Sequence, residues 1–172
     1  MTENLLFDFF KHHHIAYQLF EHQPVFTVHE KPIVTAIDGV AVSSGAIPEP
    51  HFKTLFLKDK NGLFFLVSVI DDKRVDLGAL SRSLGCGRFS FGRPAELLEL
   101  LKLTPGAVTP YALMFDQQKR VAYVLDEDAL AYSSVSFHPL RNDMTVVTSP
   151  QVFLACMEKM EHQPRIVQIP VK

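Results

Sequence analysis

The chain has 172 residues, 47% of them hydrophobic, and its 17 basic and 19 acidic side chains leave a formal charge of −2 with histidine neutral. This length predicts one domain over residues 1–172 with a core of its own, because a typical domain has roughly 150 residues. Balanced charge, with 14 phenylalanines and only 8 glycines, excludes disordered, collagen-like and histone-like chains.

The cysteines and the lack of long apolar segments bear on location. Cys86 and Cys156 outline no disulfide framework and favour reduced thiols. No stretch approaches the roughly 18 to 20 apolar residues that a membrane-spanning helix needs. Glu3 and Asp8 near the start are unlike a signal peptide. We therefore expect a cytoplasmic protein with no membrane partner.

The first 50 residues predict a helix, a strand and a second helix. Apolar side chains at helical spacing predict a helix that ends near the histidine run 12–14. These histidines could bind a metal, but no second ligand cluster accompanies them, and cationic imidazoles also suit the C-terminus of a helix. Alternation predicts a strand over 15–20, and 25–37 predicts a short helix broken by Pro32, with a loop at 43–50.

A β-hairpin is predicted in the middle of the chain. Its strands are the apolar runs 52–58 and 63–70, and Asn61-Gly62 lies in the connection between them. Asn-Gly between alternating apolar runs is among the strongest short-range hairpin signals.

The rest of the chain mixes helical and extended patterns. A helix is predicted between the N-cap Asp76 and Gly85, and Pro94 opens another. A last amphipathic helix follows Ser149-Pro150. Strands are predicted at 111–115, 120–125, 134–137, 144–148 and 166–169.

The order of these elements indicates the fold class. Strands cluster into hairpins, and helices interrupt them without a strict β-α-β alternation. This order predicts an α+β fold with a mixed, mainly antiparallel sheet, curled into a partial barrel and surrounded by helices.

Common catalytic signatures are absent from the sequence. There is no Gly-x-Ser-x-Gly elbow, Walker loop, dinucleotide fingerprint or Cys-x-x-Cys pair. Cys86 between two glycines could be a nucleophile, but a thiol with no assignable base is more often structural. We expect no metal and no cofactor.

Lys53 is the first of three candidates for chemistry. Alternation along its strand places Lys53 on one face with Leu55 and Leu57. A lysine at the edge of a sheet can extend its ammonium group into solvent. A fixed cation lining a pocket would instead suit a phosphate or a developing negative charge.

The second candidate is the segment 104–110, Thr-Pro-Gly-Ala-Val-Thr-Pro. Pro105-Gly106 fits the centre of a type II turn, and Pro110 restrains the exit. An ordinary connection between helix and strand is the commoner explanation for such a loop taken alone, but rigid backbone N–H groups can also bind a carbonyl oxygen or oxyanion.

The third candidate is the segment 137–145. Pro139 biases His138 toward an extended backbone. His138, Asn142 and Thr145 then bring an imidazole, an amide and a hydroxyl close together at a junction of strands. They could orient a water or a polar substrate, although Pro, Asn and Asp also suit a hairpin turn.

Together with Glu21-His22-Gln23-Pro24-Val25-Phe26-Thr27, these segments resemble the YbaK-like family of aminoacyl-tRNA editing domains. The resemblance runs over most of the chain. It implies a mixed α/β domain that hydrolyses the ester of a mischarged aminoacyl-tRNA for proline, without a metal or a covalent nucleophile. It also implies a transient association with prolyl-tRNA synthetase.

The resemblance also implies roles for individual residues. Lys53, Gly106 and His138 correspond to catalytic positions. The implied substrate-binding residues are Thr54, Ala107, Val108, Thr109, Pro110, Asn142 and Thr145. The loop is most similar to that of deacylases for Ala-tRNA(Pro), with Cys-tRNA(Pro) deacylases as the alternative. Thr54 departs from the asparagine that follows the lysine in many relatives, which bears on amino-acid preference.

Two other classes of protein share these features. A non-catalytic module that binds a tRNA end or a nucleotide would carry the same lysine and loop. A regulatory protein could use the same face for a partner. Eight of the basic residues between positions 53 and 102 predict a local patch for a few tRNA phosphates: Lys53, Lys58, Lys60, Arg74, Arg82, Arg88, Arg93 and Lys102.

Overall fold

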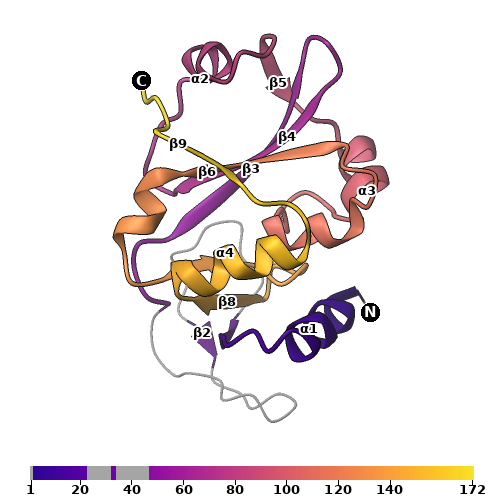
Figure 1. The fold of residues 1–172 in the computed structure, drawn as a ribbon, viewed down its shortest axis with the longest axis vertical. Coiled ribbons are helices and arrows are strands. Elements are labelled where there is room, and N and C mark those ends of the chain that lie inside the picture. The colour runs from indigo at the N-terminus through magenta and orange to yellow at the C-terminus, as the bar shows by residue number, and fades with distance from the viewer. Residues whose placement is uncertain (1, 23–31, 34–46) are drawn as a thin grey trace.

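The computed structural model describes residues 2–22, 32–33 and 47–172 (Figure 1). Its helices are α1 (Thr2–His12), α2 (Leu77–Leu84), α3 (Pro94–Leu101) and α4 (Pro150–Lys159), with 3-10 helices η1 (Pro110–Phe115) and η2 (Glu127–Ala131). Its strands are β1 (Gln18–His22), β2 (Pro32–Ile33), β3 (Phe52–Asp59), β4 (Phe64–Ile70), β5 (Phe89–Phe91), β6 (Val121–Asp126), β7 (Val135–Phe137), β8 (Met144–Thr148) and β9 (Arg165–Val167).

These strands form two sheets. One is antiparallel with the order β2-β1-β8-β7, and the other has the order β5-β3-β4-β6-β9. In the second sheet β4 pairs with β6, and β6 with β9, in parallel, whereas β3 pairs antiparallel with β4 and β5. The α+β class with mainly antiparallel pairing is confirmed. The strands divide between two sheets instead of curling into one, and β9 extends an edge.

The predicted hairpin is confirmed as β3 and β4. Phe52 pairs with Ile70 at one end and Lys58 with Phe64 at the other. Gly62 has a φ of 85°, a left-handed conformation that glycine adopts readily. The Asp59 carboxylate accepts hydrogen bonds from the N–H groups of Asn61 and Leu63, which closes the turn.

Alternate side chains of β3 enter two hydrophobic cores. Phe52 and Phe56 face the main core, which also takes buried side chains from α1, α4, η1 and the four-stranded sheet. Leu57, with Leu55 packed beside it, faces a smaller core with Leu80 of α2. One strand therefore contributes to both cores, as the period of two requires.

Most of the predicted helices are present with their expected caps. Asp76 accepts a hydrogen bond from Ala79 N–H at the start of α2, Gly85 ends that helix with a φ of 71°, and Ser149 caps α4. None of the helices within the described ranges is long and apolar enough to cross a bilayer.

Two predicted elements are wrong. Residues 111–115 belong to η1 instead of a strand, because the Thr109 hydroxyl accepts from Tyr111 N–H and Pro110 suits the first turn of a helix. Pro32–Ile33 is a strand paired with β1, where a helix was expected. The other residues of 25–37 lie outside those that the structure describes.

Candidate functional site

Lys53 lies half-buried on β3, opposite Val69 of β4. It shares its face of the strand with Leu55 and Leu57, as predicted. Its Nζ donates a hydrogen bond to the backbone carbonyl of Lys73 at 2.7 Å. The ammonium group is therefore anchored to the turn that follows β4, instead of extending freely into solvent.

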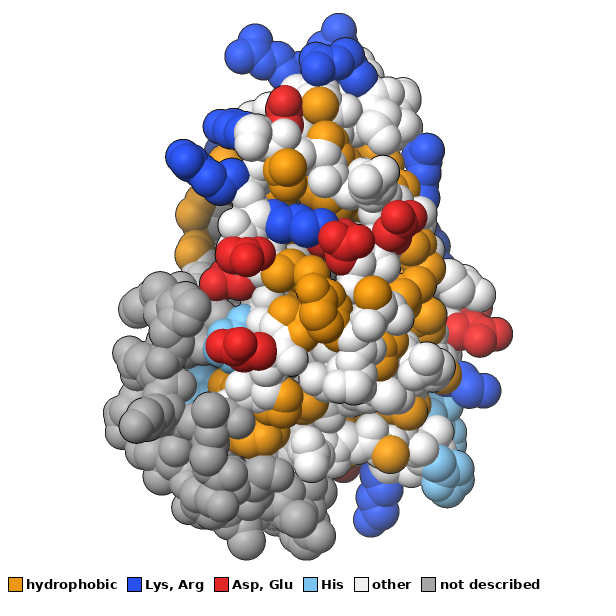
Figure 2. All heavy atoms as spheres, turned by 90° about the vertical axis from the view of Figure 1, so that its left-hand side faces the viewer, with side chains coloured by type: hydrophobic (Ala, Val, Ile, Leu, Met, Phe, Trp, Pro, Cys, Tyr) orange, Lys and Arg blue, Asp and Glu red, His pale blue; other side chains and the backbone are white. Residues whose placement is uncertain are grey.

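Lys73 itself is fixed by two carboxylates. Its Nζ lies 2.8 Å from Asp126 Oδ2 and 2.7 Å from Asp128 Oδ2. Burial lowers the pKa of Lys73, but hydrogen bonds to the two aspartates outweigh it and leave the pKa raised. Figure 2 shows basic side chains beside acidic ones in the middle of one face. The turn whose carbonyl holds Lys53 is thus tied to the end of β6.

Thr54 points to the opposite face of β3 from Lys53. Its Oγ1 lies 2.9 Å from Ser68 Oγ, and the Tyr123 hydroxyl donates to the same oxygen at 2.8 Å. Burial raises the pKa of Tyr123, which keeps this hydroxyl protonated as a donor. Thr54 is therefore part of a chain of hydrogen-bonded hydroxyl groups. Lys53 and Thr54, both predicted for the site, face opposite sides of the strand.

The segment 104–110 forms the predicted turn. Ala107 N–H donates to the carbonyl of Thr104 at 3.2 Å, and Gly106 has a φ of 94°. These features define a type II turn with proline and glycine at its centre. Thr109 is fully buried, and its hydroxyl caps η1. Val108 packs against the main core.

His138 follows β7 and has a defined hydrogen bond. Because a carbonyl oxygen only accepts, Nδ1–H donates to Met144 O at 2.8 Å, and the neutral ring then keeps a lone pair on Nε2. Burial lowers the pKa of His138, and the bond to Met144 offsets part of that effect. Neutral imidazole is the expected form at pH 7, with Nε2 able to accept a proton or hydrogen bond.

Thr145 is joined to a histidine that the predicted site does not contain. His22 of β1 is only 4% exposed, and its Nε2 lies 2.9 Å from Thr145 Oγ1. The His22 and His138 rings are 6.1 Å apart. In the sequence, His22 appeared only as part of the resemblance. No local pattern distinguished it, because its neighbours Glu21 and Gln23 are also polar and Thr145 lies 123 residues away.

Asn142 is half-buried in the turn between β7 and β8. Its neighbours Arg141 and Asp143 form an ion pair, and Arg141 also reaches Glu3 of α1 at 3.1 Å. These contacts anchor the turn to the first helix.

The three predicted segments meet through aromatic rings. Phe52, next to Lys53, lies 5.5 Å from the ring of Phe137, next to His138. Tyr111, next to Pro110, lies 6.3 Å from the same ring. In the described part of the chain, however, no hydrogen bond or ion pair joins Lys53, His138 and the 106–110 loop to one another. The segments share a core, and their polar groups surround it.

A pocket of about 230 Å³ opens where β3 begins and β4 ends. Three of its lining residues, Glu49, Asp71 and Asp72, carry carboxylates, and such a rim attracts a cation more than a phosphate. Across residues 2–22, 32–33 and 47–172, no three His, Cys, Asp or Glu side chains are placed to hold a metal ion. The pocket is lined by Glu49, Pro50, His51, Ile70, Asp71 and Asp72.

Comparison with known proteins gives the family. Residues 30–156 match the aminoacyl-tRNA editing domain family. The chain belongs to this family.

The alignments with curated relatives span most of this chain and most of each relative. The chain is 40% identical over 154 residues to prolyl-tRNA synthetase associated domain-containing protein 1 of Xenopus laevis, covering 86% of this chain and 84% of the relative. The Danio rerio protein of that name is 36% identical, with 93% and 83% covered. Prolyl-tRNA editing protein ProX of Acetoanaerobium sticklandii is 35% identical, with 78% and 77% covered.

Solved structures share the fold. A hypothetical protein, APE2540, has a TM-score of 0.69 and 19% identity, covering 95% of this chain and 97% of its own. A protein provisionally assigned as a trans-editing enzyme for prolyl tRNA synthetase has a TM-score of 0.59 and 23% identity, with 74% of each chain covered.

Proposed function

We propose that this protein is a trans-editing hydrolase that cleaves the ester of mischarged aminoacyl-tRNA for proline, with Ala-tRNA(Pro) as its substrate. The observation that carries the proposal is the match to the editing family together with 35% identity to a prolyl-tRNA editing protein. The acceptor end of proline tRNA is the partner, and prolyl-tRNA synthetase is a transient one.

Hydrolysis of an aminoacyl ester needs no strong catalytic group from the protein. An aminoacyl ester is already activated, so placing a water and stabilising the tetrahedral oxyanion accelerates its hydrolysis. In our proposal Lys53 binds the terminal adenosine or its phosphate, and backbone amides of residues 106–110 hold the ester carbonyl. Nε2 of His138 accepts a hydrogen bond from the attacking water. The neighbouring ribose hydroxyl of the substrate can relay the proton, accepting one from the attacking water while donating its own to the departing ester oxygen, so no strong base is needed.

Selection against the correct amino acid would be steric in this proposal. Ala107 is buried and Val108 partly buried beside Gly106. A narrow pocket with this apolar wall would admit a methyl group and reject a pyrrolidine ring, because pockets exclude larger groups better than smaller ones. Thr54 affects the pocket only through its hydroxyl chain.

The test is single-turnover hydrolysis of proline tRNA charged with Ala, Cys, Ser or Pro. We expect fastest release of alanine and little release of proline. Lys53→Ala should lower kcat/KM on Ala-tRNA(Pro) by about 100-fold or more, the usual effect of losing one charged or oxyanion contact. Lys11→Ala on α1 removes an exposed lysine elsewhere and should leave the rate unchanged.

The outcomes separate the candidate functions. Faster release of cysteine than of alanine would assign the Cys-tRNA(Pro) activity instead. Tight binding of charged tRNA without hydrolysis would indicate a non-catalytic module. Full activity in Lys53→Ala would overturn the assigned role of Lys53.

A further inference from the structure

Charge is unevenly distributed along this chain. Residues 53–70 and 77–95 contain six basic side chains and a single acidic one, Asp59, although the whole chain has a charge of −2. The remaining residues therefore carry an excess of negative charge. The basic residues of these two segments are Lys53, Lys58, Lys60, Arg82, Arg88 and Arg93.

The fold gathers most of these residues at one end of the molecule. The tip of the β3–β4 hairpin, α2 and β5 lie together there (Figure 1), and Lys and Arg side chains project from the same end in Figure 2. Asp59 is 3% exposed, and its carboxylate accepts hydrogen bonds from Leu63 and Gly87 N–H. The single acidic side chain of these two segments is thus turned inward, away from any ligand.

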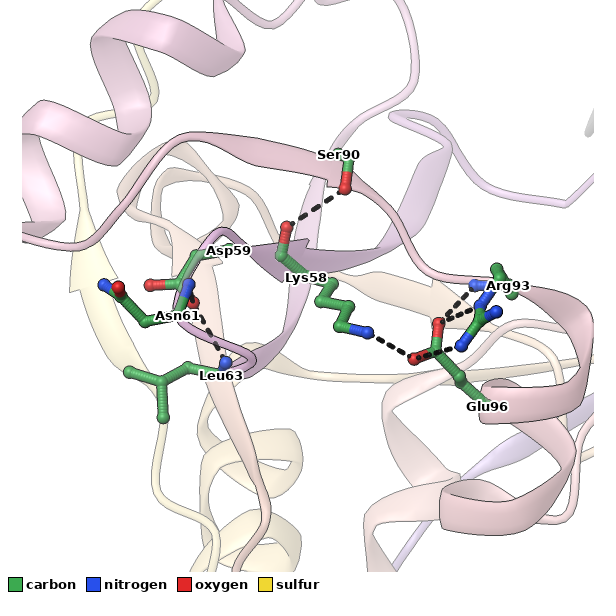
Figure 3. Close-up of polar contacts among 7 residues, drawn as sticks. All are labelled: Lys58, Asp59, Asn61, Leu63, Ser90, Arg93 and Glu96. Carbon is green, nitrogen blue, oxygen red and sulfur yellow. Dashed lines mark hydrogen bonds and ion pairs between the residues drawn. The ribbon is translucent and has the colours of Figure 1, made fainter.

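The basic residues at this end are in two different situations. Lys58 and Arg93 both contact the Glu96 carboxylate, at 2.7 Å and 3.3 Å (Figure 3). Lys60, Arg82 and Arg88 are exposed, and within the described ranges none of them forms an ion pair. These three cations, which we name the basic end, remain available to an external anion.

Close packing holds Lys60 near Arg88. Gly87, which precedes Arg88, lies so near Lys60 that a Cβ on it would come within 2.6 Å of Lys60 Cγ. Phe91, at the end of the edge strand β5, is 63% exposed, and Leu63 beside the hairpin turn is 56% exposed. Exposed aromatic rings among cations are typical of surfaces that bind nucleic acid.

We propose that the basic end binds backbone phosphates of the tRNA acceptor stem while the acceptor terminus lies near Lys53. This inference rests on the proposed function. Lys53 and the hairpin turn are separated by the length of β3, roughly 20 Å at 3.3 Å per residue. The basic end therefore contacts the stem at a distance from the ester and contributes to affinity, not to chemistry.

Binding of uncharged proline tRNA at several salt concentrations tests the proposal. Lys60→Ala and Arg88→Ala should each weaken binding at low salt, and each should reduce the slope of log K against log salt by about 0.7 to 0.9. Lys159→Ala on α4 is the matched control, because it removes an exposed cation outside the basic end. Variants that bind as Lys159→Ala does would overturn the proposal.

Two substrates of different length provide the second arm. On Ala-tRNA(Pro), the double variant Lys60→Ala/Arg88→Ala should raise KM several-fold with kcat unchanged. On an alanyl ester of a CCA trinucleotide, which is too short to reach the basic end, the same variant should match the wild type. An equal loss on both substrates would contradict the proposal.

Two further outcomes are informative. If the wild type hydrolyses neither substrate, the proposed function fails, but the binding measurement still decides whether the basic end holds the stem. Equally tight, equally salt-dependent binding of a DNA duplex of the same length would overturn the assignment to the acceptor stem in favour of a general polyanion surface.

Discussion

Individual side chains show how the candidate site is held in place. Lys53 is anchored by the Lys73 carbonyl, and Lys73 by Asp126 and Asp128. His138 is oriented by the Met144 carbonyl. Lys53 is therefore supported by the turn after β4, and His138 by the start of β8. Such support stabilises one geometry, which catalysis by positioning requires.

The pH dependence of activity should report the protonation of His138. Burial lowers its pKa, so the neutral ring should persist below the ordinary value of about 6.5. We expect kcat/KM on Ala-tRNA(Pro) to be level through pH 7 and to fall only at more acidic pH, as Nε2 takes up a proton. His138→Gln should lower the rate and abolish that acidic limb.

An unchanged acidic limb in His138→Gln would assign the titration to another group. Two charged groups act on the pKa of His138: His22 lowers it and Asp143 raises it. The matching Asp143→Asn variant separates the effect of Asp143 from that of His22.

Contacts between elements explain why α3 stays on the sheet. The Lys58 ammonium on β3 reaches Glu96 on α3 at 2.7 Å and lies 5.4 Å from the centre of the Phe64 ring. The bond from Lys58, followed by those from Arg93, lowers the pKa of Glu96 to about 2. Gly92 leaves no room for a side chain, because a Cβ there would meet the Phe56 ring at 2.2 Å. The chain can therefore pass closely from β5 to α3.

Glu96 should contribute to stability in a defined pH range. Its pKa is about 2 in the folded protein and about 4.3 in an unfolded chain. The stabilisation is thus present above about pH 4.3 and is lost as the pH falls through 2. Glu96→Gln should lower the free energy of unfolding at pH 7 and flatten its fall between these pH values, as urea titrations can measure.

Glu99→Gln is the control, since Glu99 is exposed and its contact with Arg120 is long, at 3.8 Å. Its curve should follow that of the wild type. A Glu96→Gln curve parallel to the wild type would show that the Lys58–Glu96 pair does not link protonation to folding.

At the level of the whole molecule, the main core joins the two sheets. Phe137 of β7 is 5% exposed and contacts the rings of Phe52 on β3, Tyr111 on η1 and Phe153 on α4. One side chain thus links the four-stranded sheet with the five-stranded sheet and with two helical elements. The three candidate segments are positioned by this same cluster.

Phe137→Ala should therefore destabilise the whole protein. Loss of a buried phenylalanine costs about 3 to 5 kcal/mol, since the cavity collapses only in part. We expect a single unfolding transition, by urea or heat, shifted to lower stability. Phe91→Ala, at an exposed ring, should change the stability by less than about 0.5 kcal/mol. Two separate transitions in Phe137→Ala would show that the sheets unfold independently.

Local patterns were sufficient for several elements. Asn61-Gly62 predicted the hairpin, Asp76 and Gly85 bounded α2, and Pro105-Gly106 predicted the type II turn. In each case the conformation depends on a few adjacent residues. The error at 111–115 arose because apolar side chains suit a buried strand and a buried 3-10 helix equally, and the cap at Thr109 decided between them.

The sequence by itself determined the α+β class, the hairpin, most helix boundaries and, through the resemblance, the family. Those features depend on local backbone preferences or on residue types at fixed positions. Only the tertiary structure decided that the strands form two sheets, that His22 reaches Thr145 and that Lys53 is held by the turn at Lys73. The physical reason is that these contacts join residues far apart in the chain, and their pairing depends on how both cores pack.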